Sequence, residues 1–144
     1  MKNRLLSLLV LLLMSSGALL AQYSPAGVWK TIDDKSGEPR SHVEIFEQNG
    51  KFHGKVVRLL RKGPETRCEN CSGAKKNQLI LGMTIVENLR AAEGFWQGGT
   101  ILDPESGNEY TCSVWFDRGQ PNELRVRGRH WSGLYRTQTW YRVQ

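Results

Sequence analysis

The sequence has few cysteines and lacks the motif that surrounds the nucleophilic serine of many hydrolases. Both absences limit the metal sites and the catalysis that the protein can support. Its three cysteines, Cys68, Cys71 and Cys112, supply one Cys-x-x-Cys pair. A structural zinc site takes four nitrogen or sulfur ligands, typically from two such pairs or from one pair and two histidines. No G-x-S-x-G segment is present, so the turn that exposes the serine of many hydrolases is missing. We therefore expect no metal, no cofactor and no catalytic residues.

Long apolar runs are also missing, except at the start of the chain. Two basic residues precede an apolar stretch over residues 5–14, and small residues follow, which is the order found in secretory signal peptides. About ten apolar residues are half of what a membrane-spanning helix needs. Cleavage is possible after Ala18 or after Ala21, and we take the second. We predict a signal peptide over residues 1–21 and an exported domain over 22–144, periplasmic or secreted, without a transmembrane segment.

Positive charge is present but is not concentrated. The chain has 20 Lys and Arg against 14 Asp and Glu, and 18 basic residues remain once residues 1–21 are removed. No basic run or aromatic stacking motif accompanies them, so we expect no nucleic-acid partner. Arg125, Arg127 and Arg129 alternate along one outward face, and Arg136 could join them. This stripe is either a solvated face or a surface that docks on anionic lipid or on a protein partner.

The apolar pattern predicts an all-β domain. Short runs are separated by Gly, Asn, Asp and Pro, and none repeats at the helical spacing. Asn49-Gly50 between two such runs is a strong hairpin signal. Because closure removes exposed sheet edges, we predict a single antiparallel barrel, closed or nearly closed. Its expected strands, about eight, cover residues 27–32, 41–47, 51–60, 80–89, 95–102, 109–116, 122–129 and 135–143.

Two residues indicate how the barrel closes. Trp29 lies in the first expected strand and Arg142 in the last, and these strands are neighbours in a closed meander. We expect the Arg142 guanidinium to lie over the Trp29 ring, a contact of about 0.5 to 2 kcal/mol. This G-x-W opening and basic closing residue resemble the signature of lipocalin and fatty-acid-binding barrels. Gly98-Gly99, beside a tryptophan, predicts a bulge or sharp bend.

Longer motifs add a more specific resemblance. The block W-x-G-G-x-I-L-D-P-x-S-G-x-x-Y-x-C runs from Trp96 to Cys112, and R-T-Q-T-W-x-R ends at Arg142. With GVWK and CENCSG upstream, they resemble the exported bacterial family called domain of unknown function 2147 over essentially the whole mature chain. The resemblance implies a lipocalin-like barrel in the cell envelope. The family has no established activity, so it implies no catalytic residues.

The CENC segment lies in a polar connection over residues 61–78, which is long for a compact domain. A disulfide between Cys68 and Cys71 would brace this loop and is our main expectation for an exported protein. A metal site completed by Cys112 and a histidine, and a thiol-redox pair, remain alternatives. Alternation along 109–116 points Cys112 inward, so we expect it to stay a free thiol.

An eight-stranded barrel has an interior that side chains fill or that holds one small ligand. We predict that this protein binds a small apolar ligand in the barrel mouth. The alternatives are an interaction module that docks its basic face on an anionic surface or protein, and a thiol-redox accessory protein that uses Cys68 and Cys71. Inward alternation gives five candidate ligand contacts: Phe52, Val56, Tyr110, Val114 and Phe116.

Overall fold

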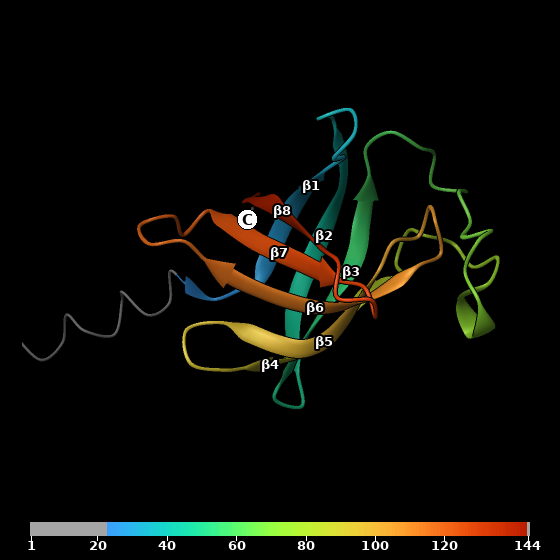
Figure 1. Cartoon of the computed structure of the whole chain (residues 1–144). Helices are drawn as coiled ribbons and strands as arrows, with labels where there is room; N and C mark the ends of the chain where they lie inside the picture. Colours follow the sequence, from blue (N-terminus) through green and yellow to red (C-terminus); the bar gives the residue numbers. More distant parts are fainter. Residues whose placement is uncertain (1–22, 144) are drawn as a thin grey trace, which may run out of the picture.

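The computed structural model describes residues 23–143, so the predicted signal peptide lies outside the described residues. Eight antiparallel strands form a closed barrel, in which each strand pairs with the next one along the chain and β8 returns to β1 (Figure 1). Among residues 23–143, no helix has the length and apolar character needed to cross a bilayer. The strands are β1 (Gly27–Ile32), β2 (Pro39–Gln48), β3 (Lys51–Leu59), β4 (Thr84–Ala91), β5 (Trp96–Leu102), β6 (Glu109–Phe116), β7 (Glu123–Arg129) and β8 (Tyr135–Arg142).

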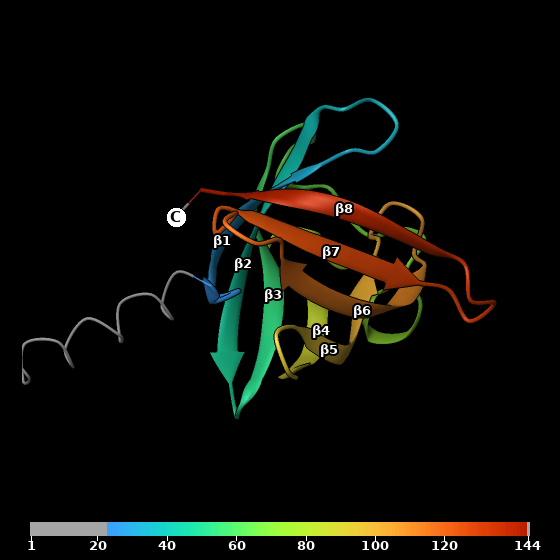
Figure 2. The same ribbon diagram turned by 60° about the vertical axis from the view of Figure 1, so that its left-hand side comes forward.

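The predicted closed barrel is confirmed, and its last seam is short. Residues Trp29 and Lys30 of β1 pair with Arg142 and Tyr141 of β8. Beyond these two pairs, β1 and β8 separate, as Figure 2 shows on the side that carries the β1–β2 connection. Because neighbouring strands run in opposite directions, the β1–β2, β3–β4, β5–β6 and β7–β8 connections lie at one end of the barrel, here called the open end. The β2–β3, β4–β5 and β6–β7 connections lie at the opposite end, here called the closed end, together with both ends of the described chain.

The turn predicted at Asn49-Gly50 joins β2 to β3. Both residues have positive φ, 54° and 74°, and Gln48 pairs directly with Lys51 across the turn. This is the two-residue hairpin geometry that asparagine followed by glycine favours, because its twist matches that of the strands.

Strand β4 begins at Thr84, four residues later than the sequence predicted. Gly82 has a φ of 87°, which ends the extended conformation. Its backbone N–H donates to Val56 O, and Met83 N donates to Ile80 O, so residues 80–83 form a turn. The connection between β3 and β4 therefore spans 60–83, and its one short helix is η2 (Gly73–Lys75).

The bend expected at Gly98-Gly99 is present in β5. The register between β5 and β6 shifts between Trp96 and Gly99, and Gly98 has a φ of 76°. A Cβ on Gly99 would lie 2.3 Å from Glu87 O of β4. Only glycine lets β4 and β5 approach this closely at the bulge, which helps the sheet to curl into a small barrel.

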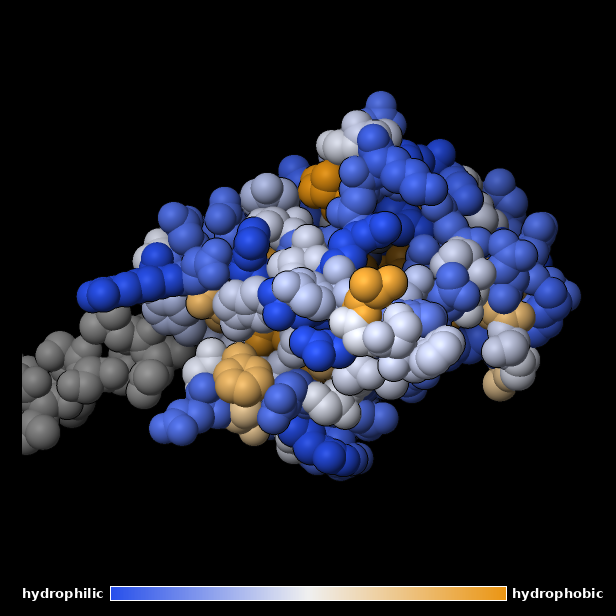
Figure 3. All heavy atoms as spheres, in the orientation of Figure 1, coloured by the Kyte–Doolittle hydropathy of each residue, from blue (hydrophilic) through white to orange (hydrophobic). Residues whose placement is uncertain are grey.

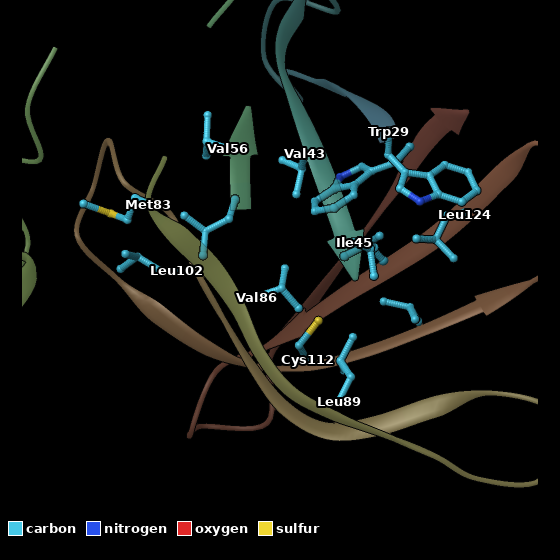
Figure 4. Packing of buried hydrophobic residues seen from close by; sticks show 14 of the residues in the cluster. Trp29, Val43, Ile45, Val56, Met83, Val86, Leu89, Leu102, Cys112 and Leu124 are labelled. Atoms are coloured by element: carbon cyan, nitrogen blue, oxygen red, sulfur yellow. The ribbon is translucent and has the colours of Figure 1, made fainter. Parts of the chain in front are cut away.

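The core runs along the inside of the barrel. Buried side chains from all eight strands belong to it, and Figure 4 shows part of this packing from close by. Around them, Phe116 makes ring contacts with Tyr23, Trp29 and Trp96 at 5.7 to 6.0 Å between centroids. Trp96 in turn contacts Phe52 at 6.2 Å. This chain of aromatic contacts plugs the closed end.

Arg142 fastens the seam between the first and last strands. Its guanidinium carbon lies 4.2 Å from the centroid of the Trp29 ring. The same guanidinium donates to the carbonyl oxygens of Ser24, Ala26 and Pro121. One side chain thereby joins β1, the segment before it and the β6–β7 connection to β8.

Candidate functional site

A cavity of about 390 Å³ occupies the open end of the barrel. Residues of all eight strands and of all four open-end connections line it. Much of the wall is apolar: Val56, Leu59, Ile80, Ile85, Ile101, Leu102, Val126 and Trp140. The barrel interior is therefore solid at one end and hollow at the other.

The few polar groups on the wall near β1 already have partners. The Thr31 and Ser41 hydroxyl oxygens lie 2.8 Å apart, and the Thr31 hydroxyl also lies 3.3 Å from Ser41 O. The Trp140 Nε1 donates to Gln138 Oε1 at 3.1 Å. At this part of the wall, a molecule in the cavity meets polar groups whose hydrogen bonds are already made within the protein, which favours an apolar group at this place.

Gly128 contributes space to the cavity. A Cβ at this position would lie 3.3 Å from the Tyr110 Cβ and 3.5 Å from the Ile101 Cγ2. The absence of a side chain at Gly128 therefore leaves Tyr110 and Ile101 as the wall beside it.

The structure divides the five predicted ligand contacts between the two ends. Val56 and Tyr110 line the cavity. Val114 is buried in the core, and Phe52 and Phe116 pack against that core, where none of the three lines the cavity. Alternation predicts that these side chains face inward, but it does not give their depth along the barrel axis.

Two turns of the same sequence pattern form part of the rim. The pattern D-x-x-S-G occurs at Asp33 in the β1–β2 connection and at Asp103 in the β5–β6 connection. In each, the aspartate carboxylate accepts a backbone N–H two residues ahead, at 2.9 Å from Lys35 and 3.1 Å from Glu105. In each, the glycine N–H donates to the aspartate carbonyl at 2.8 Å. Asp33 and Asp103 therefore cap their own turns in the same way.

Arginines link these turns to the barrel wall. Arg40 of β2 donates to Asp103 Oδ1 at 2.6 Å and lies 3.2 Å from Glu105 Oε2. Arg61 donates to Asp33 Oδ2 at 3.0 Å and lies 3.5 Å from Glu105 Oε1. Both arginines line the cavity. Arg40, Arg61, Asp33, Asp103 and Glu105 thus form a network in which each of these five charges has a partner.

The network lowers the pKa of both aspartates. Partial burial raises the pKa of Asp103, but the hydrogen bond and positive charge of Arg40 outweigh it, and the pKa lies below its ordinary value. The pKa of Asp33 is held well below its ordinary value, mainly by the Ser36 backbone N–H and further by Lys35 and Arg61. Both carboxylates therefore stay ionised well into the acidic range.

Asp34 bridges the gap where β1 and β8 part. Its Oδ2 accepts from Gln138 Nε2 at 2.7 Å and from Arg136 at 3.4 Å. Asp34, Arg136 and Gln138 all line the cavity. The side chain of Asp34 thus takes the place of backbone pairing at this part of the wall.

A disulfide joins Cys68 to Cys71 in the β3–β4 connection. Both residues are buried, with exposed fractions of 0% and 3%. The loop around them is braced by Cys68 N–H to Gln78 O and Asn77 N–H to Cys68 O. Asn70 Nδ2 donates to Glu105 O at 2.7 Å. The braced loop therefore holds one of the rim turns in place.

Cys112 is free and lies buried on β6. Burial raises the pKa of its thiol to about 12. Within residues 23–143, no group of three or more His, Cys, Asp or Glu side chains is arranged to hold a metal ion.

The predicted basic stripe lies on the outer face of β7, where its arginines contact other side chains. Arg125 donates to Thr139 Oγ1 at 2.6 Å and lies 3.5 Å from Asp117. The Arg127 guanidinium carbon lies 4.9 Å from the Trp115 ring centroid. Arg129 is exposed.

Sequence reasoning missed the rim residues Asp33, Asp34, Arg40 and Arg61. The repeated D-x-x-S-G pattern was a usable signal, because two identical turns in odd-numbered connections of a meander lie at the same end of the barrel. The arginines gave no such signal, since Arg40 and Asp103 are 63 residues apart.

The family model described as "Uncharacterized protein conserved in bacteria (DUF2147)" matches residues 27–142. The chain belongs to the DUF2147 family. This match covers every strand of the barrel. Among solved structures, the DUF2147 chain is similar to protein HP1028 from Helicobacter pylori, described as belonging to the lipocalin family. The two share 21% identity over 84% of each chain, with a TM-score of 0.72. This likeness shows a lipocalin-like fold. No curated protein matches the chain.

Proposed function

We propose that the protein binds one small, largely apolar molecule in the open-end cavity. The observation that carries this proposal is the cavity itself: about 390 Å³ with apolar side chains from most of the strands on its wall and charged side chains at its rim, in a barrel whose other end holds a chain of aromatic contacts. This volume lies at the lower end of the range of about 300 to 1,000 Å³ typical of small-molecule sites. The site would act after export by the signal peptide predicted over residues 1–21, in the periplasm or outside the cell.

The rim supports a ligand that carries no strong charge. Arg40 and Arg61 are each paired with two carboxylates. A charged ligand would have to break these pairs or leave one of its own groups without a partner, and both are costly in a partly buried site. We therefore propose a neutral or weakly polar molecule whose apolar part contacts Val56, Ile101 and Val126.

Two alternative functions were considered from the sequence: a thiol-redox role and docking on an anionic surface. The redox role is not favoured, because Cys68 and Cys71 form a buried disulfide and a reactive pair needs an accessible sulfur. Docking on an anionic surface involves the outside of β7 and β8 and is compatible with an occupied cavity.

The test has two parts. Native mass spectrometry of protein purified from its own host should show a co-purified small molecule. Titration with the neutral fluorescent probe N-phenyl-1-naphthylamine should show one saturable site. Ile101→Trp fills the cavity and should abolish saturable binding, whereas Thr100→Trp adds the same bulk on the opposite face of β5 and should leave it unchanged.

Absence of both a co-purified molecule and saturable probe binding would contradict the proposal. Equal probe binding by the two variants would also contradict it, because the bound probe would then lie outside the barrel. Circular dichroism and thermal unfolding of each variant separate a filled cavity from an unfolded protein.

A further inference from the structure

The turn between β7 and β8 holds large apolar side chains in solvent. Trp131 is 91% exposed, Leu134 75% and Tyr135 59%. In the rest of the chain that the structure describes, no large hydrophobic residue exceeds 43%. In Figure 3, one hydrophobic group with residues of intermediate hydropathy beside it lies where Figure 1 places this turn. Clustered exposure of this kind marks an interaction site more often than scattered single residues do.

The turn is ordered by its own hydrogen bonds. His130 N donates to Leu134 O at 2.7 Å, and Gly133 N donates to His130 O at 2.9 Å. The His130 Nδ1 and the Ser132 hydroxyl lie 2.8 Å apart. The His130 ring lies 5.1 Å from the Trp131 ring and 6.4 Å from the Tyr110 ring, between centroids. A braced hairpin therefore presents Trp131 outward.

Positive charge surrounds the exposed side chains. Arg127, Arg129 and Arg136 flank the turn, and residues 124–144 include no acidic residue. The guanidinium carbons of Arg127 and Arg129 lie 4.2 and 5.6 Å from the Tyr135 ring centroid. The side chain of Arg136 is 70% exposed although Asp34 lies 3.4 Å away. Within residues 23–143, neither Arg127 nor Arg129 has a carboxylate within 4 Å. The turn thus combines interfacial aromatic residues with uncompensated cations.

We propose that the β7–β8 turn docks the protein on an anionic phospholipid bilayer. Trp131 and Leu134 enter the interface, and Arg129 and Arg136 meet lipid phosphates. Tryptophan and tyrosine prefer the membrane–water interface, and arginine beside them is attracted by anionic headgroups. The turn projects from the barrel (Figure 2). A protein interface buries roughly 800 Å² per partner, which is more than a projecting turn with two exposed apolar side chains provides. Two such side chains are enough for shallow insertion into lipid.

Docking in this way brings the cavity to the membrane. Leu134 and Tyr135 belong to the exposed tip and also line the cavity, so the mouth would face the bilayer. An apolar ligand could then pass between lipid and barrel without crossing open water. This consequence rests on the proposed ligand binding, whereas the docking itself does not.

Flotation with lipid vesicles tests the docking. Protein purified from its host is mixed with vesicles of phosphatidylcholine alone or with added phosphatidylglycerol. We expect at least about tenfold stronger binding to the anionic vesicles, weakened by salt. Trp131→Ser with Leu134→Ser should reduce binding by about tenfold or more, as should Arg129→Glu with Arg136→Glu. Phe95→Ser and Arg118→Glu, at the closed end, are the matched controls and should change binding by less than about twofold.

Three results would overturn the proposal. The native protein fails to float with anionic vesicles, the tip variants float as well as the native protein, or the controls lose as much binding as the tip variants. Light scattering after size exclusion is run in parallel. A dimer that Trp131→Ser converts to a monomer would assign the turn to a second copy of the chain instead. Probe binding without vesicles is measured on every variant, so failure of docking and failure of ligand binding are told apart.

Discussion

The Arg142 guanidinium lies 4.2 Å from the centroid of the Trp29 ring and donates hydrogen bonds to three carbonyl oxygens from two other segments. We predict that Arg142→Met lowers the free energy of unfolding by about 2 to 3 kcal/mol, since it removes a cation–π contact and several charged hydrogen bonds. Arg142→Lys should lose less, because it keeps the charge but not the planar fork. Urea denaturation measures both.

The control for this prediction is Arg118→Met, an exposed arginine in the β6–β7 connection, which should change stability by less than about 0.5 kcal/mol. If Arg142→Met were as mild as this control, the β1–β8 seam would not depend on Arg142.

Stability should fall in acid partly through Asp103. Its folded-state pKa is lower than its ordinary value, so its ion pair with Arg40 stabilises the fold above about pH 4, the range of an unfolded aspartate. That stabilisation disappears as the pH falls through the lower folded-state pKa. We expect Asp103→Asn to cost about 1 to 2 kcal/mol at pH 7, and the difference from the native protein to shrink steadily as the pH falls below that range.

Thermal unfolding across this pH range provides the measurement, and Glu93→Gln in the exposed β4–β5 connection is the control. A pH-independent difference between Asp103→Asn and the native protein would show that the carboxylate acts by packing instead of by charge.

The disulfide should order its loop more than it stabilises the barrel. Closing so short a ring contributes at most about 2 kcal/mol by loop entropy. We expect Cys68→Ala with Cys71→Ala to lower global stability by no more than this and to make residues 60–83 the first site of proteolysis in native conditions. Reductant should reproduce this effect in the native protein and leave the double variant unchanged. Initial cleavage elsewhere would contradict the local role.

Cys112 should be unreactive in the folded protein. Burial raises the pKa of its thiol to about 12, so the thiolate is scarce at pH 8 and alkylating reagents lack access. Intact mass should show no modification by iodoacetamide in native buffer and one modification in denaturant. Stability should also decline above about pH 8.5, because the unfolded thiol ionises there and the folded one does not. Fast native alkylation would disprove the burial.

The turn chemistry and the two ends of the sequence were enough to predict the barrel. Asn49-Gly50 predicted the hairpin between β2 and β3, and Trp29 and Arg142 predicted that β1 pairs with β8. The start of β4 was wrong because an apolar run reads as a strand whether or not Gly82 takes positive φ. An apolar pattern predicts which face of a segment is buried, but it does not predict that the backbone turns inside the segment.

The sequence predicted only part of the candidate site. Period-two alternation assigned Val56 and Tyr110 to the interior, and they line the cavity. It assigned Phe116 there equally, although Phe116 belongs to the aromatic plug. Depth along the axis depends on strand tilt and stagger over the whole barrel. The rim pairs were out of reach, because residues far apart in the chain meet only once the sheet has closed.

The division of the interior into a plugged end and a hollow end has an evolutionary consequence. Substitutions of partly exposed wall residues such as Ile101 and Tyr110 can change which molecules fit, while the aromatic contacts at the closed end keep the chain folded. Family members that bind different ligands could therefore share the same closed end, and we expect sequence variation within the family to concentrate on the cavity wall.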